Sequence, residues 1–273
     1  MSRLAVSVGS RLRGMREALA SLVFPAPCRI CARILDTGNR IPFCHACVAA
    51  LTQTLPEPLC ARCGRPIVSS AVTGGSSPPL CHLCWLGAYD FDFARSFGAY
   101  TPSMARAILM LKYGEITPLG GWFARHLAQL AGRNAGPLAA DVVVPVPLHA
   151  SRLRERGYNQ AELIARPLAR ILGIPFRSYL LVRTRPRPDK LRLTRRERWE
   201  TVRGAYAMHP GAKVDKLQVL LVDDVLTTGA TLDACSRALR GAGAVRVAGL
   251  TVARALPSSV APDAAQWNQD LEE

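Results

Sequence analysis

The stretch Val219-Leu220-Leu221-Val222-Asp223-Asp224-Val225-Leu226-Thr227-Thr228-Gly229-Ala230-Thr231 decides the fold. Its four consecutive apolar residues, 219–222, predict a buried strand. Two carboxylates, Asp223 and Asp224, follow at the end of that strand, and residues 232–239 after the threonines predict a helix. A strand, a turn and a helix in this order are typical of open α/β sheets, in which ligands bind beyond the carboxyl ends of the strands.

The residues after the predicted strand have the composition of an anion-binding turn. Thr227, Thr228 and Thr231 supply hydroxyls, and the backbone N–H groups of Gly229 and Ala230 stand free at the start of the next helix. Such a helix N-terminus favours a phosphate dianion. The two aspartates would repel a phosphate beside them, so they suit sugar hydroxyls or a metal-bound water. An unrelated α/β turn with a capped helix uses the same residue types, because Thr and Asp favour caps.

In order and composition, this stretch resembles the substrate loop of type I phosphoribosyltransferases. The resemblance implies a site for phosphoribosyl pyrophosphate. In that site, Asp223 and Asp224 would be the catalytic acids facing the ribose hydroxyls, and residues 227–231 would hold the 5′-phosphate. In phosphoribosyl transfer, pyrophosphate leaves the anomeric carbon and Mg²⁺ often bridges its oxygens, so Mg²⁺ is the expected cofactor at this site.

Composition indicates a folded chain that binds anions. The 273 residues suffice for one large or two modest domains, and 49% of them are hydrophobic, which argues against a disordered chain. The 35 Lys and Arg against 20 Asp and Glu give a formal net charge of +15, which favours nucleic acid or phosphorylated metabolites as ligands. No apolar run approaches the length of a membrane span, and the expected location is the cytoplasm.

Residues 1–24 are predicted to form an amphipathic helix, because Leu12, Met15, Leu19 and Leu22 recur at helical spacing. Ser, Gly and Arg interrupt the apolar run, which argues against a secretory signal. The same arginine- and serine-rich composition leaves a transit peptide open. Residues 257–273 are polar, and we expect this tail to be disordered.

Eight of the nine cysteines form four Cys-x-x-Cys pairs, which predict metal sites. The eight are Cys28, Cys31, Cys44, Cys47, Cys60, Cys63, Cys81 and Cys84. Gaps of 12 residues between the first two pairs and 17 between the last two are typical of tetrahedral zinc sites. Four pairs therefore predict two structural zinc sites in a double zinc ribbon over residues 25–88.

The pairing of the cysteines is open at this point. The simplest arrangement joins pairs that are consecutive in the sequence, and an interleaved arrangement is the alternative. Disulfides are disfavoured, because no export signal places the chain in an oxidising compartment. The ninth cysteine, Cys235, lies in the predicted helix after the threonine turn and suits a small buried apolar position.

Residues 89–256 have the pattern of an α/β domain in which strands alternate with helices. We predict a strand or hairpin arm at 91–100 and strands at 141–144, 218–222 and 245–252. Helices are predicted at 104–113, 122–131 and 161–172, with a kink in the last at Pro167. This alternation predicts a mostly parallel sheet.

Three further clusters carry a resemblance over nearly the whole chain. They are Leu111-Lys112-Tyr113-Gly114; Pro145-Val146-Pro147-Leu148 with Arg152 and Arg156-Gly157-Tyr158-Asn159-Gln160; and Arg195-Arg196-Glu197-Arg198 with Arg203-Gly204-Ala205-Tyr206. Together with the Asp-Asp and Thr-Thr-Gly stretch, they resemble the ComF family, the competence protein F group that includes GntX-like proteins. The resemblance implies a double zinc ribbon before a domain like type I phosphoribosyltransferases. It also implies a link to the competence machinery and to single-stranded DNA in natural transformation.

Two positions depart from the family pattern. Lys190 stands where members often carry Gln, and Thr201 stands where they often carry Asn. Both lie in residues 181–203, which we predict to be a mobile loop. Such a loop can close over a phosphorylated ligand, and it can equally track a nucleic-acid backbone. We therefore carry no substrate preference across from the family.

The turn that contains Pro147 follows a predicted strand and is the predicted pyrophosphate platform. Arg152 and Arg156 are four residues apart, so on a helical turn they share one face and are predicted to grip the ligand. A solvated basic face is the alternative for these two arginines.

Two functions follow from this sequence. The first is a phosphoribosyltransferase-like protein that binds phosphoribosyl pyrophosphate and acts in competence, DNA uptake or nucleotide salvage. The second is a non-catalytic protein that binds single-stranded DNA and retains the phosphoribosyl pyrophosphate site. The sequence indicates no nucleobase pocket, so the acceptor and the occurrence of turnover stay open.

Overall fold

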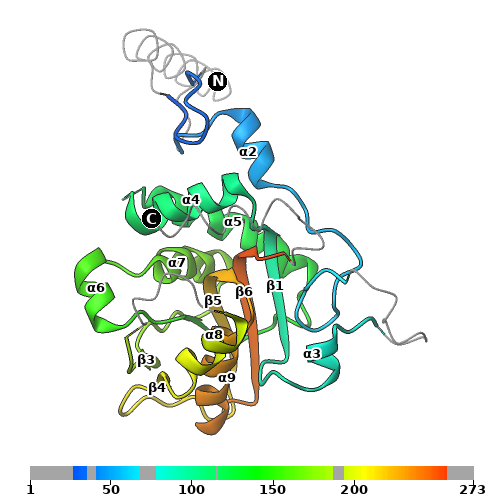
Figure 1. The fold of residues 1–273 in the computed structure, drawn as a ribbon. Coiled ribbons are helices and arrows are strands. Elements are labelled where there is room, and N and C mark those ends of the chain that lie inside the picture. The colour runs from blue at the N-terminus through cyan, green and yellow to red at the C-terminus, as the bar shows by residue number, and fades with distance from the viewer. Residues whose placement is uncertain (1–26, 36–40, 68–77, 115, 187–193, 257–273) are drawn as a thin grey trace, which may run out of the picture. The chain divides into compact units, whose positions relative to one another are not determined.

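The computed structural model describes residues 27–35, 41–67, 78–114, 116–186 and 194–256 (Figure 1). The predicted N-terminal helix, the predicted disordered tail and Lys190 lie outside these ranges. The chain divides into two compact units between Thr52 and Gln53, and each is described by itself. In the described ranges, no helix combines the length and the apolar character needed to cross a membrane.

In the smaller unit, the chain folds back between Pro27 and Ile34, which form an antiparallel bridge. Helix α2 (His45–Leu51) follows, and it begins directly after the third cysteine, Cys44. Phe43 and other apolar side chains are buried around these elements. A metal ion held by the four cysteines of this unit would crosslink it.

The larger unit is built on a four-stranded sheet in which every neighbouring pair is parallel, as the sequence predicts. The strand order is β1 (Phe93–Ala99), β6 (Arg246–Arg254), β5 (Gln218–Leu226) and β2 (Val142–Pro145). Strand β1 is the first strand in this order and is therefore an edge strand. It pairs in parallel with β6, so of the two predicted alternatives it is a sheet strand and not a hairpin arm.

Strand β5 is longer than the sequence predicts. It does not stop at residue 222, because Asp223 and Val225 pair with Thr251 and Ala253 of the neighbouring strand β6. The two aspartates consequently lie within the strand and not beyond its end. Hydrogen bonding to a partner strand outweighs the low strand preference of aspartate here.

Helices cover both faces of the sheet. The helices α4 (Pro102–Tyr113), α5 (Pro118–Arg133) and α7 (Gln160–Leu172) confirm the three predicted helices, and α5 and α7 pack on one face. Helices α8 (Arg195–Val202) and α9 (Ala230–Gly241) lie in front of β5 and β6 in Figure 1. Short helices α3 (His82–Trp85) and α6 (Ala150–Arg156) complete the unit.

The segment predicted as a mobile loop contains regular secondary structure in its described part, which excludes residues 187–193. It contributes β3 (Leu181–Arg183), which pairs antiparallel with β4 (Tyr206–Met208), and then helix α8. A capping box starts that helix: the Thr194 hydroxyl accepts from the Glu197 N–H, and the Glu197 carboxylate accepts from the Thr194 N–H. The sequence of this helix is rich in charged residues and has no clear apolar periodicity, so periodicity did not predict it. The capping pair Thr194 and Glu197, by contrast, is recognisable in the sequence.

Helix α7 continues through Pro167, and helix α5 packs closely against the backbone carbonyl that this proline leaves without its helical hydrogen bond. A proline has no N–H, so the Leu163 carbonyl four residues earlier lacks its helical donor. Helix α5 approaches that carbonyl at Gly120, where an added Cβ would lie 2.4 Å from the Leu163 oxygen. Only glycine allows the two helices to pack this closely.

This packing yields a prediction for two adjacent glycines. Gly120→Ala should destabilise the protein by about 1–3 kcal/mol, because the new methyl group meets a backbone atom that cannot move away. Gly121→Ala, where a Cβ meets nothing within 4 Å, should stabilise it by about 0.5–1 kcal/mol through helix propensity. Urea unfolding of both variants checks this, and equal effects at the two positions would contradict the packing described.

Candidate functional site

The candidate site lies where β2 and β5 end, at the carboxyl edge of the sheet. Past its last residue, the chain of β2 continues beside β5, since the Val146 N–H donates to the Val222 carbonyl over 2.9 Å. Pro147 is buried in this connection. The turn at residues 227–231 follows β5 at the same edge, so both predicted ligand-binding connections are neighbours.

The threonine turn, residues 227–231, has a shape that glycine permits. Gly229, at the centre of the turn, has φ +89° and immediately precedes Ala230, the first residue of helix α9. A Cβ at this position would lie 2.7 Å from the Tyr89 ring, so glycine is required by both the backbone and the neighbour. The Thr228 hydroxyl accepts from the Ala230 N–H over 3.3 Å. The turn thus gathers backbone donors and hydroxyls at a helix N-terminus, the arrangement that favours an anion.

Asp224 is buried, and two polar partners meet at one of its carboxylate oxygens. Its side chain is 8% exposed, and its Oδ2 lies 2.8 Å from Lys112 Nζ and 3.1 Å from the donating Gln160 Nε2. Burial alone would lower the pKa of Lys112, but the charge and hydrogen bond of Asp224 outweigh this effect and raise it. The ion pair therefore persists at neutral pH and holds the end of α4 against β5.

The contacts of Asp224 extend to a third motif. Gln160 accepts from Arg156 Nη1 over 2.6 Å, and the Arg156 guanidinium lies 4.5 Å from the centroid of the Tyr113 ring. The Tyr158 hydroxyl donates to the Leu111 carbonyl over 2.7 Å. A cavity of about 130 Å³ opens beside this network, lined by Lys112, Tyr113, Glu155, Arg156 and Tyr158. Three sequence clusters thus meet in one place.

Asp223 points away from that network. Successive strand residues face opposite sides of a sheet, so Asp223 lies on the side of β3 and β4. Its Oδ1 accepts from the Asp224 N–H over 2.8 Å, and the described side chains provide it with no salt bridge. Burial, together with the charge of Asp224, raises the pKa of Asp223 to about 8. The two aspartates differ in surroundings, and they do not converge on one point.

The two predicted arginine ligands also separate. Arg156 belongs to the network around Asp224, whereas Arg152 lies 3.5 Å from Glu155 in an ion pair one turn along α6. Lys112 and Gln160 were not among the predicted site residues. Each was a single polar residue at the end or start of an apolar helical stretch, a position from which a side chain reaches the carboxyl edge.

Two cysteine clusters hold four sulfurs each, and their membership confirms the consecutive pairing. One cluster contains Cys28, Cys31, Cys44 and Cys47, and the other contains Cys60, Cys63, Cys81 and Cys84. All four sulfurs of a cluster lie within 4.8 Å of one another, and one pair in each cluster is 3.6 Å apart. Tetrahedral Zn–S bonds of about 2.3 Å would place sulfurs roughly 3.8 Å apart. The donor set and spacing fit two structural zinc ions.

The second cluster is part of the larger unit. Its residues Cys60, Cys63 and Cys84 are buried in the same core as Leu221 of β5 and Leu232 of α9. The Arg254 side chain, 1% exposed, donates from Nη1 to the Cys63 carbonyl over 3.3 Å. Its Nη2 lies 3.8 Å from the Cys63 sulfur. A buried guanidinium at this distance would offset the negative charge of four thiolates around a zinc ion.

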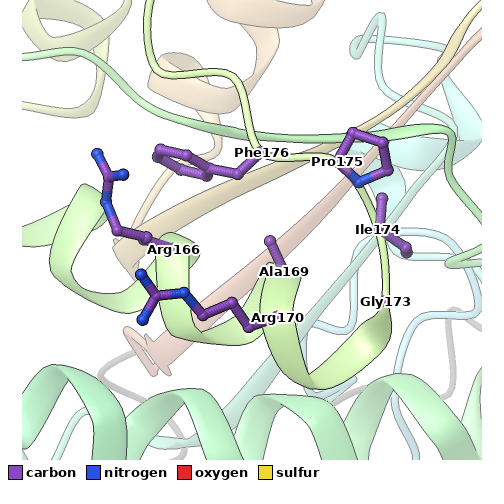
Figure 2. Close-up of a pocket in the computed structure, with 7 residues that line it drawn as sticks. All are labelled: Arg166, Ala169, Arg170, Gly173, Ile174, Pro175 and Phe176. Carbon is purple, nitrogen blue, oxygen red and sulfur yellow. The ribbon is translucent and has the colours of Figure 1, made fainter.

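A larger hollow of about 480 Å³ lies away from this site, between the later turns of α7 and the segment after it (Figure 2). Arg166, Arg170 and Phe176 line it, and the Arg166 guanidinium lies 4.6 Å from the centroid of the Phe176 ring. No residue of the predicted sugar-phosphate site contributes to it.

Comparison with known proteins agrees with this architecture. A phosphoribosyl transferase domain model matches residues 159–270, and a double zinc ribbon domain model matches residues 19–85. The chain is 30% identical over 229 residues to DNA utilization protein YhgH of Salmonella typhi, which covers 83% of this chain and 96% of that protein. It is 28% identical over 211 residues to Competence protein F of Haemophilus influenzae, covering 72% and 90%. It is 27% identical over 218 residues to Competence protein ComFC of Bacillus subtilis, covering 77% and 83%.

Similar solved structures include glutamine phosphoribosylpyrophosphate amidotransferase from B. subtilis, with 20% identity, a TM-score of 0.35, and coverage of 52% of this chain and 30% of that one. Another is adenine phosphoribosyltransferase from Thermoanaerobacter pseudethanolicus, with 17% identity, a TM-score of 0.32, and coverage of 48% and 68%.

The parallel sheet and the two cysteine clusters define a type I phosphoribosyltransferase-like α/β protein with an N-terminal double zinc ribbon. The chain belongs to the ComF family, which includes the competence protein F and YhgH relatives.

The raised pKa of Asp223 predicts a stability that depends on pH. Between the ordinary aspartate pKa of 3.8 and about 8, the folded state keeps a proton that the unfolded state has lost, so stability falls as pH rises through this window. Asp223→Asn should match the wild type in stability near pH 4, and its advantage over the wild type should grow as pH rises to about 8 and stay level above that. Thermal unfolding across this range measures the difference.

Asp215→Asn, in the exposed turn before β5, is the matched control and should show no such trend. A stability difference between Asp223→Asn and wild type that stays constant with pH would contradict the raised pKa of Asp223.

Proposed function

We propose that the chain binds phosphoribosyl pyrophosphate with Mg²⁺ at the carboxyl edge of β5. The observation that carries the proposal is the threonine turn: a left-handed glycine and the free N-terminus of α9 directly follow a strand that bears two aspartates. Membership of a competence and DNA-utilization family gives this ligand a context in DNA uptake or nucleotide salvage.

The 5′-phosphate suits the threonine turn. Thr227, Thr228 and Thr231 offer hydroxyls, and the N-terminus of the twelve-residue helix α9 offers backbone N–H groups and its positive dipole end. The one acid in the first turn of α9, Asp233, does not oppose this, because it is buried and accepts from the Asp90 N–H and from Arg237. Its charge is already neutralised.

The sugar and the pyrophosphate suit the residues around the turn. Asp223, which has no salt bridge among the described side chains, is the proposed acid for the ribose hydroxyls and for Mg²⁺, a cation that prefers oxygen ligands. Bound Mg²⁺ would offset the charge of the pyrophosphate oxygens. Asp224 would contribute from the other face of the strand, by keeping Lys112 in place. Pro147, Arg152 and Arg156 are proposed to face the pyrophosphate.

Single-stranded DNA binding is the second candidate function. The net charge of +15 and the names of the relatives favour it. The hollow in Figure 2 supplies two arginines beside an aromatic ring, the residue types that contact the phosphates and bases of a single strand. This candidate needs neither the aspartates nor the threonine turn.

The double variant Thr227→Val/Thr228→Val tests the first candidate. Calorimetric titration of zinc-loaded protein with phosphoribosyl pyrophosphate and Mg²⁺ should show binding in the wild type. The affinity should fall by about tenfold or more in the variant, because a hydrogen bond to a charged phosphate contributes about 1.5–3 kcal/mol. Thr52→Val, in the smaller unit, should bind like the wild type.

Two outcomes would contradict this proposal. One is an absence of heat in the wild type, and the other is equal affinity in the double variant. Titration of the same proteins with a single-stranded oligonucleotide decides the second candidate: binding that is unaffected by the threonines and weakens with salt would favour it.

A further inference from the structure

Tyr89 connects the second cysteine cluster with the threonine turn. It lies five residues after Cys84, in the segment that leads from the cluster to β1. Its side chain is 4% exposed, and its hydroxyl donates to the Thr228 carbonyl over 2.8 Å. The same ring fills the space that a Cβ at Gly229 would need. One side chain therefore fixes both the carbonyl and the glycine at the centre of the turn.

The position of Tyr89 is itself well determined. Its ring stacks on Phe91 with centroids 4.6 Å apart, and Trp199 of α8 lies on it at 5.8 Å. The next residue, Asp90, donates its N–H to the Asp233 carboxylate over 2.7 Å, one turn into α9. The segment around Asp90 thus lies beside the first turn of α9 and holds Tyr89 next to the threonine turn.

The second zinc ribbon supplies the remaining support. Arg62 lies between the ligands Cys60 and Cys63, and its guanidinium donates to the Tyr89 carbonyl over 2.6 Å and to the Phe91 carbonyl over 2.6 and 2.9 Å. The Arg62 carbonyl accepts from the Ala94 N–H of β1 over 2.8 Å. The loop that carries two zinc ligands is therefore hydrogen-bonded to the backbone of Tyr89 and of the residues that follow it.

We propose that Tyr89 is the positioning residue of the threonine turn, and that the second zinc ribbon holds Tyr89 in place through Arg62. The turn would form its anion-binding shape only while this support is intact. This inference rests on the proposed function insofar as the turn is the phosphate site. It adds a role for the zinc ribbon in that site, since the ribbon then controls ligand affinity without touching the ligand.

Amide hydrogen exchange in ligand-free, zinc-loaded protein tests the proposal. Tyr89→Phe keeps the ring and removes only the hydroxyl. It should speed exchange at residues 227–231 by about fivefold, the factor that corresponds to one typical hydrogen bond. Arg62→Gln should speed exchange at the same residues, although its side chain contacts none of them. Zinc content and melting temperature should stay close to wild type in both variants.

Matched controls are Tyr179→Phe, where the side chain is exposed, and Arg177→Gln, where the guanidinium donates to the neighbouring Phe176 carbonyl. Neither should change exchange in the turn. Unchanged exchange at residues 227–231 in both Tyr89→Phe and Arg62→Gln would overturn the proposal.

A second measurement separates this inference from the proposed function. Titration with phosphoribosyl pyrophosphate and Mg²⁺ should give about fivefold weaker binding by Tyr89→Phe than by wild type, for the same reason. Equal binding by wild type and variant would overturn the positioning role alone. If the wild type binds none of this ligand, the proposed function fails, and the exchange experiment still decides the role of Tyr89.

Discussion

The buried ion pair between Lys112 and Asp224 is the interaction on which the rest of the site depends. A carboxylate in the middle of a parallel sheet is strongly unfavourable unless a cation and hydrogen bonds compensate it. Lys112 supplies the cation at 2.8 Å and Gln160 supplies a hydrogen bond at 3.1 Å. Lys112 belongs to α4 and Gln160 to α7. The contacts that compensate the charge of Asp224 therefore hold two helices at the edge of the sheet where β5 ends. Gln160 in turn accepts a hydrogen bond from Arg156, and the Arg156 guanidinium lies over the ring of Tyr113 at the end of α4.

The opposite face of the sheet is organised differently. There the second cysteine cluster shares an apolar core with β5 and α9, and Tyr89 joins the cluster to the threonine turn. Asp223 lies on this face of the sheet and has a raised pKa. Asp224 lies on the other face and forms the ion pair with Lys112. Two adjacent acids of one strand thus have separate environments, a common condition for separate chemical roles. A zinc ribbon attached to such a domain is consequently part of the architecture of the proposed site.

Much of the fold could be predicted from the sequence, because it depends on residues that are close together in the chain. Cysteine spacing predicted two clusters, and alternating apolar runs predicted the parallel sheet and three of its helices. Three features depended on distant residues and could not be predicted in this way. Strand β5 extends past residue 222 because β6 pairs with it, and Asp223 and Asp224 separate because a strand alternates its faces. Lys112 gains its role only when α4 ends beside β5. Helix α8 is a different case, since its capping box was visible in the sequence and was missed.

A double-mutant cycle on Lys112 and Asp224 tests the central claim most directly. Lys112→Met should lower the free energy of unfolding by about 3 kcal/mol, because it leaves the buried Asp224 carboxylate without its cation. Asp224→Asn should lower it less, because the Lys112 side chain is 24% exposed and water can hydrate its ammonium group. The double variant should lose far less than the sum, which corresponds to a coupling free energy of about 2 kcal/mol or more in urea unfolding at pH 7. Additive losses, with a coupling below about 0.5 kcal/mol, would show that the pair does not hold the site together.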